Sequence, residues 1–130
     1  MFLAYAQPGP TDIDFGEFIE HEHRRMSIRA AWQAYHRDVD VFLCPVNFTT
    51  AIPHDDRPFE QRRVATTSGP RPYTDQSFWT AHASLPGLPA VSAPIRTTAG
   101  GLPIGIQIIG PRYEDDTAIT FAELLAAGAS

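Results

Sequence analysis

The first strong pattern along the chain is helical. Asp14 is a suitable N-cap, and Glu17 stands at the third helical position, from which its side chain reaches back to the cap. The helix is expected to run to about Arg37. Its apolar residues form two sets that point more than a quarter turn apart, namely Phe15/Phe18/Ile19 and Ile28/Ala31/Trp32/Tyr35. Either the helix breaks at the charged residues 20–25, or its ends pack against different neighbours, which implies a larger body than 130 residues easily provide.

The apolar run Val39–Pro45 follows almost at once and predicts a buried strand closed by its proline. A helix that leads directly into such a strand is half of an α/β unit. The next stretch, nearly thirty residues long, has no periodicity and contains several prolines. A loop of that length is either functional or lies across another part of the structure. Residues 77–85 are expected to form a helical turn or a short helix.

The most patterned stretch is Gly87–Pro111, in which two apolar runs each follow Gly-Leu-Pro. Ala90–Ala93 and Ile104–Ile109 predict two strands, and the glycine-containing loop between them favours an antiparallel pair. In the second strand, Gly105 indicates a close approach by another backbone or side chain.

The last pattern is again helical. Asp115 or Asp116 is expected to cap a helix that ends at Gly128, with an apolar stripe formed by Ala118, Phe121, Ala122 and Leu125. The order is therefore helix, strand, long loop, strand pair and helix. This order predicts the α/β class, with residues 1–130 as one partial domain and no second domain.

Composition narrows the functional classes. The formal charge of −5 argues against nucleic-acid binding, which needs a basic surface. All ten basic residues are arginines, so the chain contains no lysine. No apolar stretch is long enough to span a membrane. The apolar start at residues 1–6 lacks the basic leader and the length of a secretory signal, so a cytoplasmic location is expected.

No single motif of this sequence points strongly to a catalytic or metal site. The sole cysteine, Cys44, is expected to be a small buried apolar residue rather than a nucleophile. His21 and His23 are two apart, so on a helix they point to nearly opposite sides, and no metal site is expected. Glu20 and Arg24 are expected to form an i,i+4 ion pair there. Ser92 lies between apolar residues without the glycine neighbours of an exposed nucleophile, which favours a packed, hydrogen-bonded serine.

Three stretches carry a resemblance to a known family. "WQAYHRDVDVFLCP", then "LPGLPAVSAPI", then "GGLPIGIQIIGPRYEDDTAITFAELL" resemble, in this order, the C-terminal part of the amidase signature family. The similarity covers Ile19–Ala127. The family includes bacterial amidases, fatty acid amide hydrolases and the amidase subunit of tRNA-dependent amidotransferases. Ser84 departs from the family pattern, which often has asparagine there, so a contact near a pocket is expected to differ.

The resemblance implies a large α/β/α sandwich around a mixed sheet. It also implies hydrolysis of a carboxylic amide through an acyl-serine intermediate. The family uses a serine nucleophile, a bridging serine in a cis peptide and a lysine, with no metal or organic cofactor. A desolvated neutral lysine draws a proton through one serine from the other. These residues lie in an upstream signature region, so no catalytic residue is assigned to this chain, and the chain alone is expected to be inactive.

Two interpretations of the whole chain therefore stand. It is the C-terminal segment of an amidase, from a truncated gene, a split gene or a cloned segment, or it is a non-catalytic binding or assembly module that retains the amidase core motifs. The first predicts as partner a missing N-terminal amidase segment, or self-association through an exposed sheet edge. With that segment restored, a small-molecule amide would bind. Tyr73, Phe78 and Trp79 are candidates for the substrate pocket, although such rings are equally expected to pack on the sheet.

Overall fold

The computed structural model describes residues 13–128, so the apolar start of the chain lies outside the described residues. Helix α1, Phe15–Tyr35, is continuous through its charged middle. Asp14 accepts a hydrogen bond from the Glu17 backbone at 2.9 Å, and the Glu17 carboxylate accepts one from the Asp14 backbone at 3.2 Å. The predicted capping box is confirmed, and the helix ends two residues before Arg37, with His36 as its C-cap.

The main sheet has three antiparallel strands in the order β1-β5-β4. They are β1, Phe42–Pro45, β4, Ala90–Thr97, and β5, Pro103–Ile109. The predicted strand pair is confirmed, since β4 and β5 form a hairpin. The strand predicted at Val39–Pro45 is shorter and begins at Phe42.

The long aperiodic stretch is not a bare loop, which corrects the sequence prediction. It contains a second antiparallel pair, β2, Arg63–Thr66, and β3, Gly69–Pro72, together with short 3-10 turns at Phe59–Gln61 and Tyr73–Gln76. Each strand has four residues, and only Val64 among them is buried. A pattern of one buried residue is too short to show the alternation that predicts a strand.

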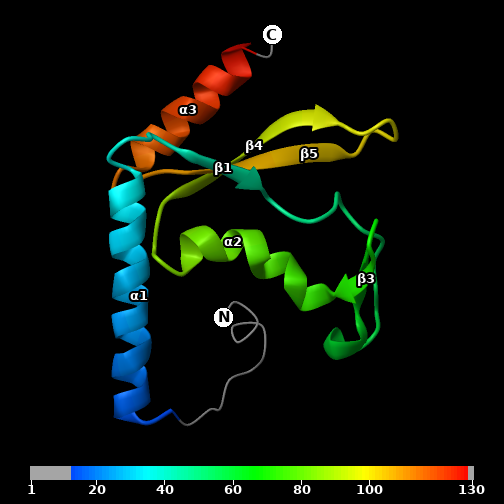
Figure 1. Cartoon of the computed structure of the whole chain (residues 1–130). Coiled ribbons are helices and arrows are strands. Elements are labelled where there is room, and N and C mark those ends of the chain that lie inside the picture. Colours follow the sequence, from blue (N-terminus) through cyan, green and yellow to red (C-terminus); the bar gives the residue numbers. More distant parts are fainter. Residues whose placement is uncertain (1–12, 129–130) are drawn as a thin grey trace.

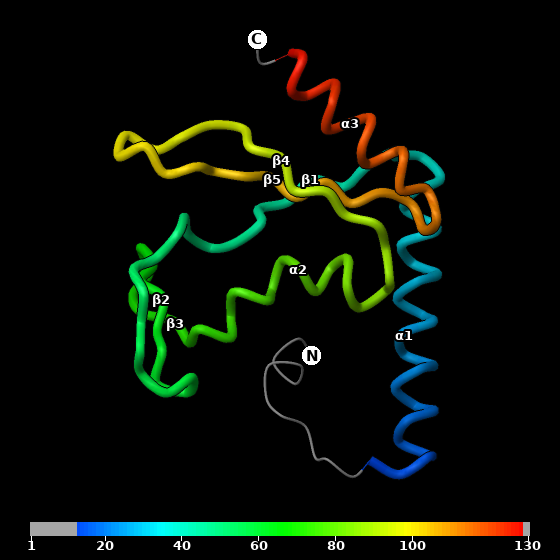
Figure 2. Tube along the Cα trace, turned by 180° about the vertical axis from the view of Figure 1, so that it is seen from behind, coloured from blue at the N-terminus to red at the C-terminus, as the bar shows by residue number. Residues whose placement is uncertain are grey.

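Helices lie on both faces of the main sheet. Helix α2, Ser77–Ser84, covers one face, and helix α3, Asp115–Gly128, lies on the opposite side (Figures 1 and 2). The small core under α2 joins Cys44, Ala83 and Ile109. On the other side, Ala118 of α3 approaches Gly110 so closely that a Cβ atom at Gly110 would lie 3.4 Å from the Ala118 Cβ. The predicted α/β class is confirmed, and both sheets of residues 13–128 are antiparallel.

Three local predictions need correction. Helix α3 begins at Asp115, so both aspartates lie inside its first turn rather than at the cap. Ser92 of β4 is exposed rather than packed. The strand after α1 is not fully buried, since Leu43 is 44% exposed at the rim of the sheet.

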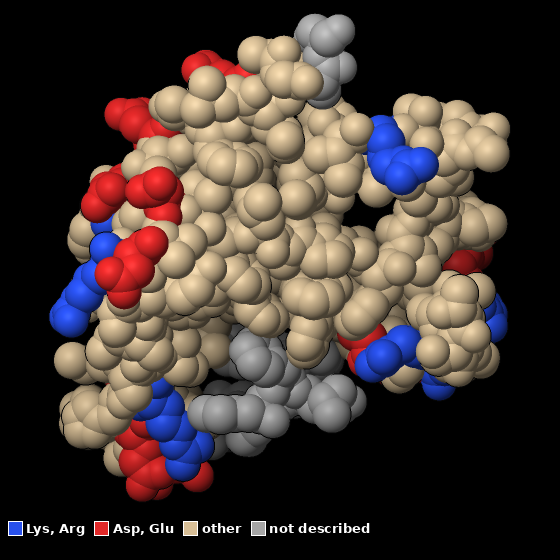
Figure 3. All heavy atoms as spheres, turned by 45° about the horizontal axis from the view of Figure 1, so that its top comes forward, with Lys and Arg blue, Asp and Glu red and all other residues tan. Residues whose placement is uncertain are grey.

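Much apolar surface remains open to solvent. Phe15 and Phe18, in the first apolar set of α1, are 77% and 47% exposed, so this set is largely open to solvent. Figure 3 shows one face on which charged side chains lie mainly at the margins, around a broad uncharged middle. Within residues 13–128, no helix combines the length and the apolar character needed to cross a membrane.

Candidate functional site

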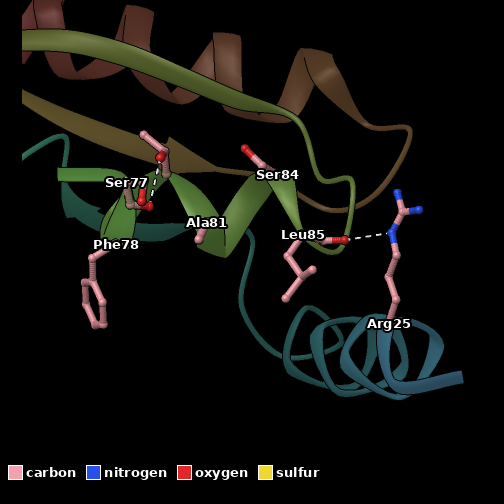
Figure 4. A pocket seen from close by; sticks show the side chains of 7 residues that line it. Arg25, Ser77, Phe78, Ala81, Ser84 and Leu85 are labelled. Carbon is pink, nitrogen blue, oxygen red and sulfur yellow. Dashed lines mark hydrogen bonds between the residues drawn. The ribbon is translucent and has the colours of Figure 1, made fainter. Parts of the chain in front are cut away.

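A pocket of about 330 Å³ lies between α1 and α2 (Figure 4). Its lining combines one cation, three hydroxyl groups and three apolar side chains: Arg25, Ser77, Thr80, Ser84, Phe78, Ala81 and Leu85. All but Arg25 belong to α2 or follow it directly. Such a mixture suits a small molecule that has both an apolar part and hydrogen-bonding groups.

The lining follows the periodicity of α2. Phe78 and Leu85 extend to one side of the helix, whereas Ser84 points to the other, so the apolar and hydroxyl residues form separate strips (Figure 4). The Ser77 hydroxyl donates to the Thr74 carbonyl at 2.8 Å, and the Thr80 hydroxyl donates to the Ser77 carbonyl at 3.0 Å. The Ser84 hydroxyl has no hydrogen-bond partner within residues 13–128 and points to the side of α2 opposite Phe78 and Leu85 (Figure 4).

Two arginines of α1 fix the C-terminal end of α2. Arg25 Nε donates to the Leu85 carbonyl at 2.9 Å, and Arg29 Nε donates to the Pro86 carbonyl at 2.8 Å. These carbonyls follow the last turn of α2, where the helix dipole is negative and a cation is favourable. Gly87 completes the turn with a φ of 71°. Arg25 also bonds Glu22 at 3.2 Å, which offsets its charge beside the pocket.

The structure brings two of the three predicted pocket residues together. The rings of Phe78 and Trp79 meet edge to face, with centroids 5.0 Å apart. Phe78 lines the pocket, whereas Trp79 packs against the core under α2. Tyr73 contacts Phe59 instead, at 5.7 Å.

Sequence reasoning missed Phe48 and Arg25. Phe48 does not line the pocket, but its ring centroid lies 5.9 Å from that of Phe78. It is half-buried and follows β1 in the aperiodic stretch, where no pattern predicts its contacts. Arg25 belongs to the charged part of α1, which is typical of a solvated face. Its contact with Leu85 spans 60 residues of sequence, and no local signal predicts it.

Cys44 is buried, as predicted, and sits beside the only buried polar side chain among the described residues, Gln107. The Gln107 amide contacts the Cys44 sulfur at 3.3 Å and donates to the Trp79 carbonyl at 3.2 Å. Burial raises the pKa of the Cys44 thiol, although the contact with Gln107 opposes the shift. The group is therefore a neutral thiol at neutral pH and packs as an apolar residue.

The charged segment of α1 shows one predicted contact. Glu20 and Arg24 form the expected ion pair, with oxygen and nitrogen 3.6 Å apart.

Residues 13–128 contain no group of three or more His, Cys, Asp or Glu side chains placed to hold a metal ion. The described pocket lining likewise has no lysine or histidine beside its serines, so it offers binding groups rather than a nucleophile with its base.

Comparisons with known proteins agree with this architecture. A model of the Amidase family matches residues 12–119. One subunit of the mitochondrial glutamyl-tRNA(Gln) amidotransferase of Mus musculus is 31% identical over 100 residues, which are 77% of this chain and 18% of that protein. The chain thus spans about a fifth of the length of this curated relative.

Two solved structures share the fold. The crystal structure of an amidase superposes with a TM-score of 0.69 at 24% identity, over 89% of this chain and 26% of that chain. A structure described as an unexpected vestigial protein complex, which reveals the origins of an s-triazine catabolic enzyme, gives a TM-score of 0.73 at 20% identity. That match covers 89% of this chain and 25% of the other. The family match extends over most of the sequence and confirms the resemblance carried by the Gly-Leu-Pro motifs, so the chain belongs to the Amidase family.

Proposed function

We propose that residues 1–130 form one part of a single amidase-type domain that hydrolyses a carboxylic amide to an acid and an amine or ammonia. The observation that carries this proposal is the family match over residues 12–119. The reaction would pass through an acyl-serine. Because the chain has no lysine, the catalytic lysine and its two serines would come from another segment of the enzyme. A cytoplasmic location remains a prediction from the sequence.

The exposed apolar surface supports an incomplete domain. Phe15 and Phe18 are large apolar residues on one side of α1, and both are open to solvent. Burying an apolar side chain of this size is worth about 1.5–3 kcal/mol, so a further segment that covers α1 would gain substantially. The two apolar sets of α1 predict that its ends pack against different neighbours. In this proposal, the neighbour of the end that carries Phe15 and Phe18 is the missing part of the amidase domain.

In this proposal the acyl group of the substrate lies against Phe78. Phe78 lines the pocket and is 38% exposed, while Trp79 supports its ring from the core side. Tyr73 belongs to a separate ring pair and would contact only a longer substrate. Ser84 would offer a hydroxyl where family members often offer an asparagine amide.

One observation favours a second candidate function, a non-catalytic assembly module. One of the structural neighbours, with a TM-score of 0.73, is described as a vestigial protein complex. By that analogy the chain would keep the amidase core as a binding surface without turnover.

Turnover assays separate the two functions. The chain is tested alone and together with an acceptor segment, defined as the part of the solved amidase that this chain does not match. The chain alone should not cleave a panel of aryl and aliphatic amides, whereas the complex should. Phe78→Ala should raise the KM of the complex for aryl amides, and Phe59→Ala, at a ring outside the pocket, should leave it unchanged.

The outcomes are distinct. Acyl transfer by the chain alone that is lost on mutating one serine would contradict the assignment of the nucleophile to another segment. A stable complex that cleaves no amide of the panel would favour the assembly module.

A further inference from the structure

Gly87, in the turn after α2, leaves an open space on one of its sides. Its φ of 71° lies in the left-handed region, and the residue is exposed. A Cβ atom at this position would lie 3.6 Å from Nη2 of Arg29 and 3.9 Å from Nη2 of Arg25. Apart from Gly87 itself and its two chain neighbours, no other atom of the described residues comes within 4 Å of that point. Two guanidinium groups therefore face one open space.

Both guanidinium groups are oriented by their Nε atoms. Arg25 Nε donates to the Leu85 carbonyl at 2.9 Å, and Arg29 Nε donates to the Pro86 carbonyl at 2.8 Å. Figure 4 shows that the terminal nitrogens of Arg25 extend past this bond, beside the loop that follows α2. Neither Nη2 atom has a hydrogen-bond partner among residues 13–128. Two oriented donors are thus left without an acceptor at the same point.

The charge around this point is not balanced. Within the described residues, the only carboxylate that pairs with either arginine is that of Glu22, which accepts from Nη1 of Arg25 at 3.2 Å. The carbonyls of Leu85 and Pro86 carry only partial negative charges. Both arginines are half-buried, so their mutual repulsion is screened less than it would be in open solvent. An anion between the two groups would relieve this repulsion.

A carboxylate matches the arrangement of donors. Its bonds to guanidinium nitrogens are about 2.7–2.9 Å long, and its two oxygens can accept from both Nη2 atoms at once. Arginine suits such binding because its planar group keeps its charge at every relevant pH. We propose that Arg25, Arg29 and Gly87 form a binding site for a carboxylate group, beside the pocket between α1 and α2.

Two sources can supply this carboxylate, and the chemistry at the arginines is the same for both. One is a free carboxylic acid, and the other is an aspartate or glutamate side chain of another segment of the enzyme. The inference goes beyond the proposed function, because binding at this site does not require turnover.

Gly87→Asp tests the site by placing a carboxyl group in the open space. Aspartate tolerates the left-handed region better than most residues do. Gly101→Asp is the matched control, because Gly101 has a φ of 81° and a Cβ there would meet nothing within 4 Å. In NMR titrations of the full chain, the pKa of the carboxyl introduced at position 87 should be lowered by about one unit or more. This is a tenfold change in proton affinity, and the pKa of the carboxyl introduced at position 101 should stay in the ordinary range.

A second measurement uses the wild-type chain, so that the test does not depend on the folding of a variant. NMR follows the side-chain N–H signals of Arg25 and Arg29 during titration with sodium acetate, with sodium chloride at equal ionic strength as the control. Acetate should shift both signals, whereas chloride should not. In Gly87→Asp the response to acetate should weaken about tenfold or more, because the introduced carboxylate already fills the site. A parallel titration with the acceptor segment distinguishes the two sources.

Either source would support the site. Signals that respond to acetate equally with and without the acceptor segment would indicate a free acid. Signals that respond to the acceptor segment and then no longer to acetate would indicate a side chain of that segment. Equal pKa values at positions 87 and 101 would overturn the inference, as would arginine signals that respond to neither acetate nor the acceptor segment. Neither measurement involves amide turnover, so loss of the proposed function would leave this inference standing.

Discussion

Replacing Arg29 by methionine tests whether α1 holds the end of α2. The substitution keeps most of the aliphatic stem and removes the donor that lies 2.8 Å from the Pro86 carbonyl. A hydrogen bond from a charged group contributes about 1.5–3 kcal/mol when desolvated. Because Arg29 is only half-buried, solvent screening lowers the expected loss to about 1–2 kcal/mol.

Urea unfolding and native-state hydrogen exchange measure this loss. The melting temperature should fall by about 3–8 °C for a chain of this size. The amides of Gly87 and Leu88, which both donate to the Ala83 carbonyl, should lose protection before the rest of the sheet does. Arg25→Met should act on the same turn, so the double variant should deviate from additivity by about 0.5–1 kcal/mol.

Arg24→Met is the matched control. Arg24 lies on the same helix, but its side chain is 58% exposed and its ion pair with Glu20 is long, at 3.6 Å. The expected change is below about 0.5 kcal/mol. If Arg24→Met destabilised the chain as much as Arg29→Met, or if Gly87 and Leu88 kept their protection in Arg29→Met, the bonds from α1 would not be what holds this turn.

Three further predictions concern single side chains. Gln107→Leu removes buried hydrogen bonds to β1 and α2 and should cost about 1–2 kcal/mol in urea unfolding, whereas Gln33→Leu on the exposed side of α1 should be neutral. Cys44 has a raised pKa, so the unfolded chain ionises first and stability should fall as pH rises above the ordinary thiol range, a slope that Cys44→Ala should remove. The pKa of Asp55 is lowered to about 2, chiefly by the hydrogen bond from Arg57, so its contribution is present above the ordinary carboxyl range and is lost as pH falls toward 2. NMR titration should show this pKa return to the ordinary carboxyl range in Arg57→Met, and no change there would contradict the assigned cause.

The elements with strong local signals are predictable from the sequence. The capping box at Asp14 and Glu17 and the β4–β5 hairpin are set by residues a few positions apart. The close approach expected at Gly105 is present, since a Cβ there would lie 3.3 Å from a Val46 methyl group. Local chemistry decides these features, so a single sequence displays them.

The pocket is not predictable in this way, because its walls are joined by contacts between distant residues. Arg25 bonds the carbonyl of Leu85, which lies 60 residues later in the sequence. Nothing near Arg25 in the sequence distinguishes it from Arg24, whose ion pair is with a residue of the same helix. The exposure of Ser92 escapes prediction for the same reason, since burial at a strand position depends on parts of the fold that are distant in sequence. Tyr73 is close to Phe78 and Trp79 in sequence, but its ring packs on Phe59.

Helix α2 is tied at both of its ends. At its start, Asn47 from the segment after β1 donates to the side chain of Gln76 at 2.6 Å, and at its finish Arg25 and Arg29 hold the carbonyls of the following turn. A helix anchored in this way cannot slide or rotate without breaking bonds to two different parts of the fold. Relatives of this chain that diverge in ligand preference should therefore do so by exchanging side chains along α2, at positions such as Phe78 and Ser84, while the path of the helix backbone stays the same.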